Sequence, residues 1–572
     1  MKKSHKFTTE GILSHWKELG VILFFSTLLC LQLLTNPGRP TTFDGHIHIT
    51  TMQMFADSLR VGELPAWSQG FGNYGYPLAL IAHQLPAYSG AVLILFGIHP
   101  ELAFKLIIVL STIASGVGMF AFIHSYLDQR ADQIRVNQSA LIGAVIWLFS
   151  TYRIMNIYSR GAVPELVASA LLPFLLLAIV NFFKSYSLKE FLLIFLFSFL
   201  LTITHPMMLV LASPLVLAGL LTRMFSQSTK RIALSAGAVL LAVILGVLAA
   251  SFYVLPLLLE LKYFYQGSSV GQISADSYLY LKNMLNWSWP YFPAGDHPGP
   301  RIGPIKVGLF EQLVLLAGGA SLLTTALRKK SKHDLILIIW IIIALATLMA
   351  TTFLAKPLYD LLPILSMIQF PWRFLLPFQF ATTIIAAILF TKYAPPFKVI
   401  ALLVCLLIIA RLPNIYGKNY ISASQTDYQF TRENLHSTNM NPVWVGETAA
   451  YPLSDSLFTV AEGAGNLLSR SESPSLRLYV FSGTTSSRIV FNTFYFPGWK
   501  LRINGGEREI EYQDPHFRGV MTTRLNPGLS NITLSYEDTK VRLMSKYISA
   551  TSIFLVGVLA LLYVKIQKWL TK

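Results

Sequence analysis

Apolar runs of about 20 residues, separated by short polar stretches, recur along the chain as far as Leu412, and one more follows near the carboxy terminus. Runs of this length match the thickness of a bilayer. The pattern predicts a polytopic α-helical membrane protein with about 12 spans, at residues 21–34, 102–124, 140–158, 163–183, 191–204, 207–221, 232–258, 307–327, 335–354, 374–391, 399–412 and 547–564.

The distribution of basic residues supports this count. With an even number of crossings both termini lie on one side, and every loop on that side is basic, as the positive-inside rule requires. We therefore predict a multi-pass protein of the cell (inner or plasma) membrane with cytoplasmic termini. The net charge of +17 is then explained by the basic cytoplasmic loops. The predicted partner is therefore the lipid bilayer and not nucleic acid.

The remaining segments suggest three regions. A transmembrane domain covers residues 1–413 and includes a long first outer loop, 35–100, built from interfacial helices. Between 414 and 545 the apolar runs stop and short alternating stretches separated by Asn-Gly and Pro-Gly turns predict an extracytoplasmic β-rich domain. The last helix and a basic cytoplasmic tail occupy 546–572.

Asp44, His46 and His48 follow the first predicted helix at alternate positions. An extended backbone would point all three side chains to one face, where the carboxylate would act as a base or the three would hold a divalent metal such as Mg²⁺ or Mn²⁺. The alternative is that Asp44 caps a helix and the histidines are interfacial.

The same loop mixes glycine with the aromatic residues Trp67, Tyr74 and Tyr76. Such rings suit stacking against the sugar of an acceptor, and equally suit an aromatic belt at the membrane surface.

The second outer loop carries Arg160 and Glu165. An outward arginine opposes the usual bias and is suited to holding a phosphate by paired hydrogen bonds, with Glu165 orienting it. A structural ion pair between the two residues is the alternative.

Further polar residues lie at the same predicted level. They are His205, more often a packed residue than a catalyst, and the run of Gln369, Trp372 and Arg373 before the tenth helix. Several outward cations favour an anionic lipid headgroup, although each alone could snorkel to ordinary phospholipid.

The chain has no phosphate-binding loop, CxxC pair, HExxH or GxSxG motif. Nucleotide-driven pumping and the familiar hydrolases therefore lack support. Nucleotide sugars are cytoplasmic, whereas the candidate residues face outward, so a donor attached to a lipid fits better.

Taken in order, these motifs resemble the GT-C superfamily of membrane glycosyltransferases, and more closely its bacterial YfhO-like branch, which overlaps the "6-pyruvoyl-tetrahydropterin synthase-related" membrane proteins. The resemblance spans nearly the whole chain. It is carried by residues 43–46, 67–77, 160–165, 204–206, 252–260, 369–373 and 496–500.

The resemblance implies an inverting enzyme that moves a sugar from a polyprenyl-phosphate carrier to an extracytoplasmic lipid, polymer or protein. It implies Asp44 as the catalytic carboxylate, with Arg160 and Arg373 on the donor phosphate. Gly45 stands where the family often has a second acidic residue, which leaves metal dependence open, and nothing in the sequence supports pterin-synthase zinc chemistry. Supporting roles fall to His46, His48, Glu165, His205, Gln369 and Trp372.

Two other functions fit the same features. A transporter or flippase for a lipid-linked glycan would also need outer cations, although related halves or paired interrupted helices are not evident in the sequence. A non-catalytic scaffold, whose β domain binds a partner, predicts that Asp44 can be neutralised without consequence.

Overall fold

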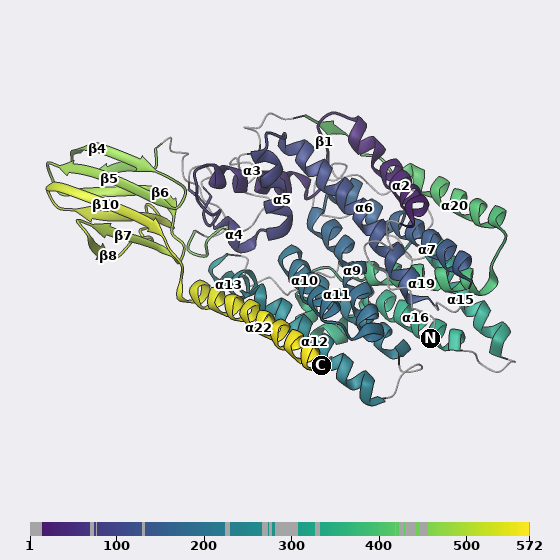
Figure 1. Cartoon of the computed structure of the whole chain (residues 1–572). Helices are drawn as coiled ribbons and strands as arrows, with labels where there is room; N and C mark the ends of the chain where they lie inside the picture. Colours follow the sequence, from purple (N-terminus) through teal and green to yellow (C-terminus); the bar gives the residue numbers. More distant parts are fainter. Residues whose placement is uncertain are drawn as a thin grey trace.

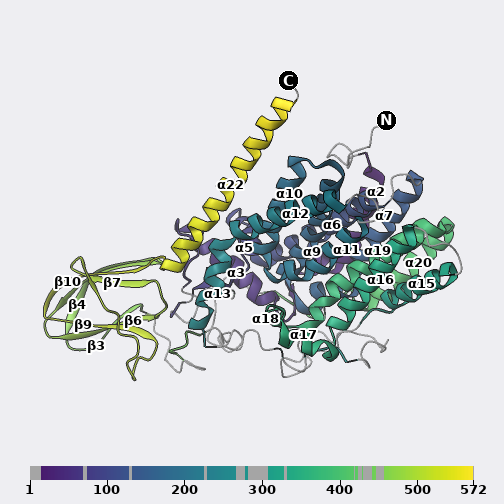
Figure 2. The same ribbon diagram turned by 90° about the horizontal axis from the view of Figure 1, so that it is seen from below.

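The computed structural model describes residues 14–68, 74–75, 77–127, 132–223, 229–265, 273, 277–280, 307–326, 332–417, 419–422, 428, 441–445 and 456–570. A helical domain and a β domain lie side by side, and the long helix α22 (Lys540–Leu570) runs from the β domain along the helical domain (Figure 1). Seen at right angles, the β domain lies at one end of the molecule, and α22, in yellow, leads away from it (Figure 2).

Each predicted span overlaps a helix in the structure. The helices are α2 (Trp16–Thr35), α6 (Pro100–Tyr126), α7 (Gln133–Leu148) with α8 (Thr151–Met155) and the π-helix η1 (Asn156–Arg160), α9 (Val163–Ser185), α10 (Leu188–Thr204), α11 (Met207–Arg223), α12 (Thr229–Ala249), α13 (Ser251–Glu260), α15 (Leu309–Ala326), α16 (Lys332–Ala350), α19 (Leu375–Tyr393), α20 (Phe397–Arg411) and α22.

The predicted span 232–258 is divided at Ala250 between α12 and α13. The backbone N–H of Phe252 donates to Ser549 Oγ of α22 at 2.8 Å. Because this N–H bonds to a neighbouring helix, it is not available for the hydrogen bonds of one continuous helix, and the contact lies at the break.

Among the described residues, seven helices are long and apolar enough to cross a membrane by length and composition. They are Trp16–Thr35, Pro100–Tyr126, Gln133–Arg160, Val163–Ser185, Ile232–Ala249, Pro371–Tyr393 and Lys540–Tyr563. The helices at the other predicted spans do not meet this combination of length and composition among the described residues, so the count of crossings stays a prediction.

Shorter elements join the long helices and form the first loop. They are β1 (Arg39–Pro40), α3 (Gly45–Arg60), α4 (Leu78–Ile81), α5 (Gln84–Leu95), η2 (Leu261–Tyr263), η5 (Phe353–Ala355), α17 (Lys356–Leu361), α18 (Pro363–Ser366), η6 (Pro371–Phe374) and η7 (Leu412–Asn414). Strand β1 pairs with β2 (Tyr420–Ile421), so the chain just after α20 still belongs to the helical domain.

The β domain contains two antiparallel sheets. One has the order β4-β5-β10-β7-β8 and the other the order β3-β6-β9. Rings from both sheets meet between them, as Phe458 of β3 lies 4.8 Å from Tyr479 of β5 between centroids. The strands are β3 (Phe458–Glu462), β4 (Gly465–Glu472), β5 (Leu476–Gly483), β6 (Ser487–Phe494), β7 (Trp499–Ile503), β8 (Gly506–Arg508), β9 (Val520–Leu525) and β10 (Gly528–Tyr536).

The predicted turn at residues 504–506 is a tight hairpin between β7 and β8. Asn504 and Gly505 both have positive φ, as a primed turn requires, and Asn504 Oδ1 accepts from the Asn531 backbone at 2.8 Å. After β10 the chain enters α22 at Lys540, where Thr539 Oγ1 accepts from the Arg542 backbone at 3.2 Å. This cap begins the helix before its apolar run starts.

Candidate functional site

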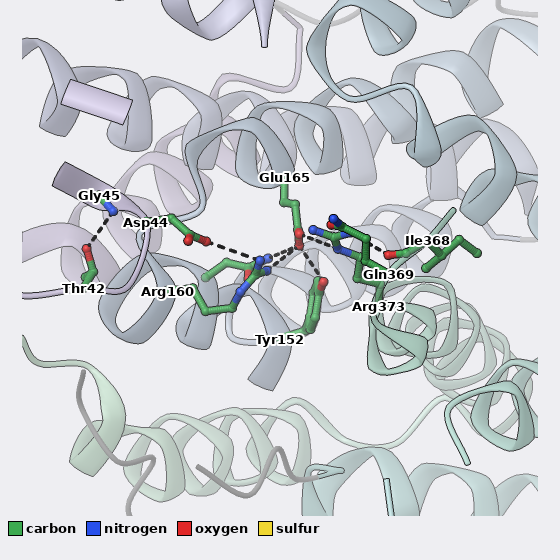
Figure 3. Close-up of polar contacts among 10 residues, drawn as sticks. Thr42, Asp44, Gly45, Tyr152, Arg160, Glu165, Ile368, Gln369 and Arg373 are labelled. Atoms are coloured by element: carbon green, nitrogen blue, oxygen red, sulfur yellow. Dashed lines mark hydrogen bonds and ion pairs between the residues drawn. The ribbon is translucent and has the colours of Figure 1, made fainter. Parts of the chain in front are cut away.

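Four charged side chains from four separate elements meet in the helical domain (Figure 3). Asp44 precedes the first residue of α3, and Arg160 is the last residue of η1. Glu165 lies in the first turn of α9, and Arg373 lies in η6 just before α19. The structure thus brings together the predicted base and both predicted phosphate-binding arginines.

Glu165 is the centre of this cluster and is only 2% exposed. Its Oε2 lies 2.7 Å from Arg160 Nη1, and its Oε1 lies 2.9 Å from Arg373 Nε. Oε2 also accepts from the Tyr152 hydroxyl at 2.5 Å and from Asn156 Nδ2 at 3.2 Å. One carboxylate therefore holds two guanidinium groups close to each other.

Arg160 is fixed by the local backbone as well as by Glu165. Its Nη1 donates to Asn156 Oδ1 at 2.8 Å, and its guanidinium lies 4.6 Å from the centre of the Trp372 ring. Gly161 follows with φ of +64°, and a side chain there would meet Thr42 Oγ1 at 2.4 Å. Only glycine allows this close approach of the first loop to the end of η1.

Arg373 is held by an unusual turn. Gln369 has a positive φ of 64°, a conformation uncommon for residues other than glycine. The turn presents the Ile368 carbonyl and the Gln369 side chain, which accept from Arg373 Nη1 at 2.6 and 3.3 Å. Both predicted supporting residues of this run, Gln369 and Trp372, thus contact one of the two arginines.

Asp44 is joined to η1 through its backbone, since its N–H donates to the Arg160 carbonyl at 2.7 Å. Although it stands at the N-cap position of α3, its side chain makes no capping hydrogen bond. Its Oδ2 lies 3.5 Å from Arg160 Nη2, and the side chain is 39% exposed. Because the surrounding protein removes part of the water around this carboxyl, its pKa lies above the ordinary value, against the opposing effect of Arg160.

Three histidines lie beside the charged cluster. The His83 and His205 rings are stacked 4.8 Å apart, and the His48 ring lies 6.4 Å from His83. His205 ends α10 because Pro206 follows it. Burial lowers the pKa of His48 to about 4 and that of His83 to about 3, and it lowers the pKa of His205 well below the usual range. All three are therefore neutral near pH 7.

The expectation that Asp44, His46 and His48 share one face of an extended strand is wrong. A helix begins at Gly45, so His46 turns away, and its ring lies 5.7 Å from Tyr428. Magnesium and manganese prefer several oxygen ligands, whereas this arrangement offers only one carboxylate. Within the residues that the structure describes, no group of three or more His, Cys, Asp or Glu side chains is placed to hold a metal.

The aromatic residues assigned to sugar stacking lie elsewhere. Trp67 is fully buried, with its ring 5.1 Å from Trp499 and 5.0 Å from Tyr536. Tyr74 is buried and stacked on Phe494 at 5.0 Å. Neither ring offers a free face to a sugar in this conformation, so the stacking assignment is corrected for both. Tyr76 lies outside the described residues.

Tyr152, Asn156 and His83 belong to the cluster but escaped the sequence analysis. The first two lie inside an apolar run, and His83 precedes a helix that looked merely interfacial. Polar residues inside a spanning segment are themselves a signal, because each must find a partner there. That signal was available for Tyr152 and Asn156.

Comparison with known families gives a clear match for the helical domain. A profile described as "6-pyruvoyl-tetrahydropterin synthase related domain; membrane protein" matches residues 84–417. The chain belongs to this family of membrane proteins. The matched part includes Arg160, Glu165 and Arg373, whereas Asp44 precedes it. No curated protein sequence matches the chain.

Solved structures similar to this family member include GT-C glycosyltransferases. The arabinofuranosyltransferase AftD from Mycobacteria matches with 13% identity and a TM-score of 0.40, over 70% of this chain and 26% of AftD. The Archaeoglobus fulgidus oligosaccharyltransferase matches with 13% identity and a TM-score of 0.41, over 72% of this chain and 56% of that chain. The chain thus spans only part of either relative, and similarity at this level assigns no activity to it.

Proposed function

We propose that the protein is an inverting membrane glycosyltransferase that moves a sugar from a polyprenyl-phosphate-linked donor to an extracytoplasmic lipid, cell-envelope polymer or protein. The observation that carries the proposal is the buried cluster in which Glu165 holds Arg160 and Arg373 together beside Asp44. Such a cluster combines an anion site with a neighbouring base.

The charge of the cluster suits a phosphate leaving group. With Asp44 ionised, the two guanidinium groups balance the two carboxylates. When Asp44 takes up a proton, the cluster gains one positive charge. That gain coincides with the negative charge that develops on the departing phosphate, so the transition state is stabilised more than the ground state.

The chemical step is a single displacement. The acceptor hydroxyl oxygen attacks the anomeric carbon as the bond from that carbon to the phosphate oxygen breaks, and the phosphate leaves with the electron pair. The hydroxyl proton passes to Asp44, whose raised pKa favours this transfer. Attack opposite the leaving group inverts the anomeric configuration.

The proposal includes an orientation. The basic loops predict cytoplasmic termini, so the cluster and the β domain would lie on the extracytoplasmic side. The donor lipid would reach the cluster from the bilayer. One carboxylate beside neutral histidines is a poor ligand set for Mg²⁺ or Mn²⁺, so we expect transfer to continue in EDTA.

The test is sugar transfer by purified protein in liposomes containing a defined polyprenyl-phosphate sugar. In Asp44→Asn we expect the rate to fall by about 10²–10⁴-fold, the usual contribution of a general base, with donor binding retained. In Arg160→Ala we expect donor binding itself to weaken. Asp57→Asn is the matched control, because Asp57 lies on α3, which Asp44 precedes, and its partners among the described residues are Gln53 and Arg60 of the same helix.

Two results would overturn the proposal. Asp44→Asn with full activity would remove the base. Movement of the intact lipid-linked sugar across the bilayer by wild type, without transfer, would identify a flippase instead.

A further inference from the structure

Between α3 and α5, the described residues 61–68, 74–75 and 77–82 contact the β domain at Trp67 and Tyr74 and then lead back to the helical domain. We call these residues the return segment. The buried Trp67 ring contacts both Trp499 of β7 and Tyr536 of β10, which also contact each other. Gly75, with φ of +75°, lies so close that a side chain would meet Trp67 Nε1 at 2.1 Å. The segment is thus folded tightly around the docked tryptophan.

Two further contacts fix the return segment to the β domain. The Phe494 N–H of β6 donates to the Tyr74 carbonyl at 2.6 Å, while the two rings stack. At the other end, Glu63 Oε2 accepts from the Ser475 backbone at 3.0 Å and from the Ser475 hydroxyl. The contacts involve both sheets, so the segment is attached to the domain as a whole.

Both ends of the return segment lead to the candidate site. Upstream is α3, which begins beside Asp44 and carries His48 in its first turn. Downstream, His83 follows Gly75 by eight positions and returns to the His48 ring at 6.4 Å. Helices α3 and α5 also pack on each other, with Phe55 4.9 Å from Tyr88. A displacement of the segment would therefore reach two parts of the site.

The β domain is itself anchored to the helical domain away from this segment. Arg542 Nε and Nη2, at the start of α22, donate to Glu260 Oε2 of α13 at 2.9 and 2.7 Å. Arg542 Nη2 also donates to the Pro497 carbonyl at 3.1 Å, and Thr539 Oγ1 donates to Glu260 Oε1 at 2.5 Å. These bonds give the β domain a fixed position against α13.

We propose that Trp67 is a positioning residue through which the docked β domain holds the start of α3 and His83 in the geometry of the site. The proposal rests on the transferase function for its kinetic consequence only. In this proposal the aromatic residues of the return segment attach it to the β domain and do not stack on a sugar. The β domain then helps to hold the site residues in place.

The experiment compares Trp67→Ala, Trp67→Phe and Trp444→Ala in the full chain in lipid nanodiscs. Trp444 is the matched control, because it joins the two domains through rings other than Trp67: its Nε1 donates to the Tyr495 carbonyl of the β domain at 2.7 Å, and its ring lies 6.1 Å from that of Tyr263 of η2. Hydrogen exchange is followed at the amides of Asp44 and His48, which bond to Arg160 and Asp44 carbonyls.

In Trp67→Ala we expect faster exchange at both amides and a fall in kcat of about 10- to 100-fold with donor KM within about twofold, as for a misplaced catalytic group. Trp67→Phe should restore most of kcat, and Trp444→Ala should change neither readout. If Trp67→Ala fails to fold, Tyr74→Leu serves the same comparison.

Unchanged exchange in a folded Trp67→Ala protein would overturn the positioning role whatever the activity. Equal effects of Trp444→Ala would also overturn it, because general loosening of the β domain would then be the cause. An inactive wild type with altered exchange in Trp67→Ala would instead reject the transferase function and keep the structural coupling.

Discussion

The helical domain contains two buried clusters of arginine and glutamate that share the short helix α8. Tyr152 donates to Glu165, and its neighbour Thr151 donates to Glu311 Oε1 at 3.3 Å. Glu311 binds a single arginine, as Arg411 Nη2 lies 2.8 and 3.1 Å from its two oxygens. Glu165 binds two arginines and has the half-exposed Asp44 nearby. The chemical groups are alike, but their ratio differs.

Under the proposed function, that ratio distinguishes an anion site from a structural ion pair. One carboxylate with one guanidinium is already neutral, and it ties α15, α20 and α8 together. One carboxylate with two guanidinium groups keeps a positive charge that Asp44 cancels only while ionised. We infer that burial alone does not identify an anion site, because Glu165 and Glu311 are 2% and 3% exposed. The second arginine on one carboxylate is the feature that identifies it.

The largest difference between the two clusters is expected when each carboxylate is neutralised in turn. Glu165→Gln and Glu311→Gln should each lower the free energy of unfolding by about 3–5 kcal/mol, since each leaves buried arginine unpaired. Only Glu165→Gln should also lower transfer, by about 100-fold, because its two arginines move apart. Denaturant unfolding in micelles and transfer at a temperature where both variants are folded test this. Equal losses of transfer would show that the two clusters do not differ in function.

The histidines beside Glu165 give a smaller effect that depends on pH. Because burial lowers the pKa of His48 to about 4 and of His83 to about 3, the unfolded chain binds more protons than the folded one below about pH 6.5. Stability should therefore fall with decreasing pH by about 1.4 kcal/mol per pH unit for each histidine, and neither should contribute above about pH 6.5.

His83→Phe isolates one of these contributions, because a phenyl ring can still stack on His205. Between pH 6 and pH 4.5 the unfolding free energy of this variant should decline less steeply than that of wild type, by about 1.4 kcal/mol per unit. Other titrating groups, Asp44 included, are common to both proteins. Parallel curves would mean that His83 becomes protonated without penalty in the fold.

The smallest effect is expected where both residues of the Glu311–Arg411 ion pair are replaced. Glu311→Leu combined with Arg411→Met should leave the unfolding free energy within about 1 kcal/mol of wild type or higher, since an apolar pair avoids the desolvation of two charges. Transfer should be unchanged. The same exchange at Glu165 and Arg160 should abolish transfer. A large loss of transfer from the first double variant would give the Glu311 pair a functional role.

The sequence was a good guide to the helices and a partial guide to the site. Each apolar run coincides with a helix among the described residues, and the prediction that Asp44, Arg160 and Arg373 lie at one membrane face anticipated their meeting. The alternating stretches predicted at residues 477–481, 488–494, 500–503 and 532–536 fall on β5, β6, β7 and β10, whereas β4 is largely exposed and so carries no two-fold pattern.

Other features depend on contacts that no local pattern encodes. The start of α3 at Gly45 is set by backbone bonds to η1, and a run of alternating polar residues gives no sign of them. The burial of Trp67 depends on Trp499 and Tyr536, which lie more than four hundred positions away in the chain. A composition rich in glycine and aromatic rings describes a ligand surface and an internal docking surface equally well.

The π-helix η1 has a consequence for how tolerant this span is to change. A π-turn contains one residue more than an α-turn, and here it lies in the last turn before Gly161. Losing one residue from this turn would close it to an ordinary α-turn and shift the helix end that carries Arg160 relative to Glu165. Most helix ends tolerate the gain or loss of a residue. At this end the number of residues determines where Arg160 lies, so a deletion should be as harmful as a substitution in the cluster.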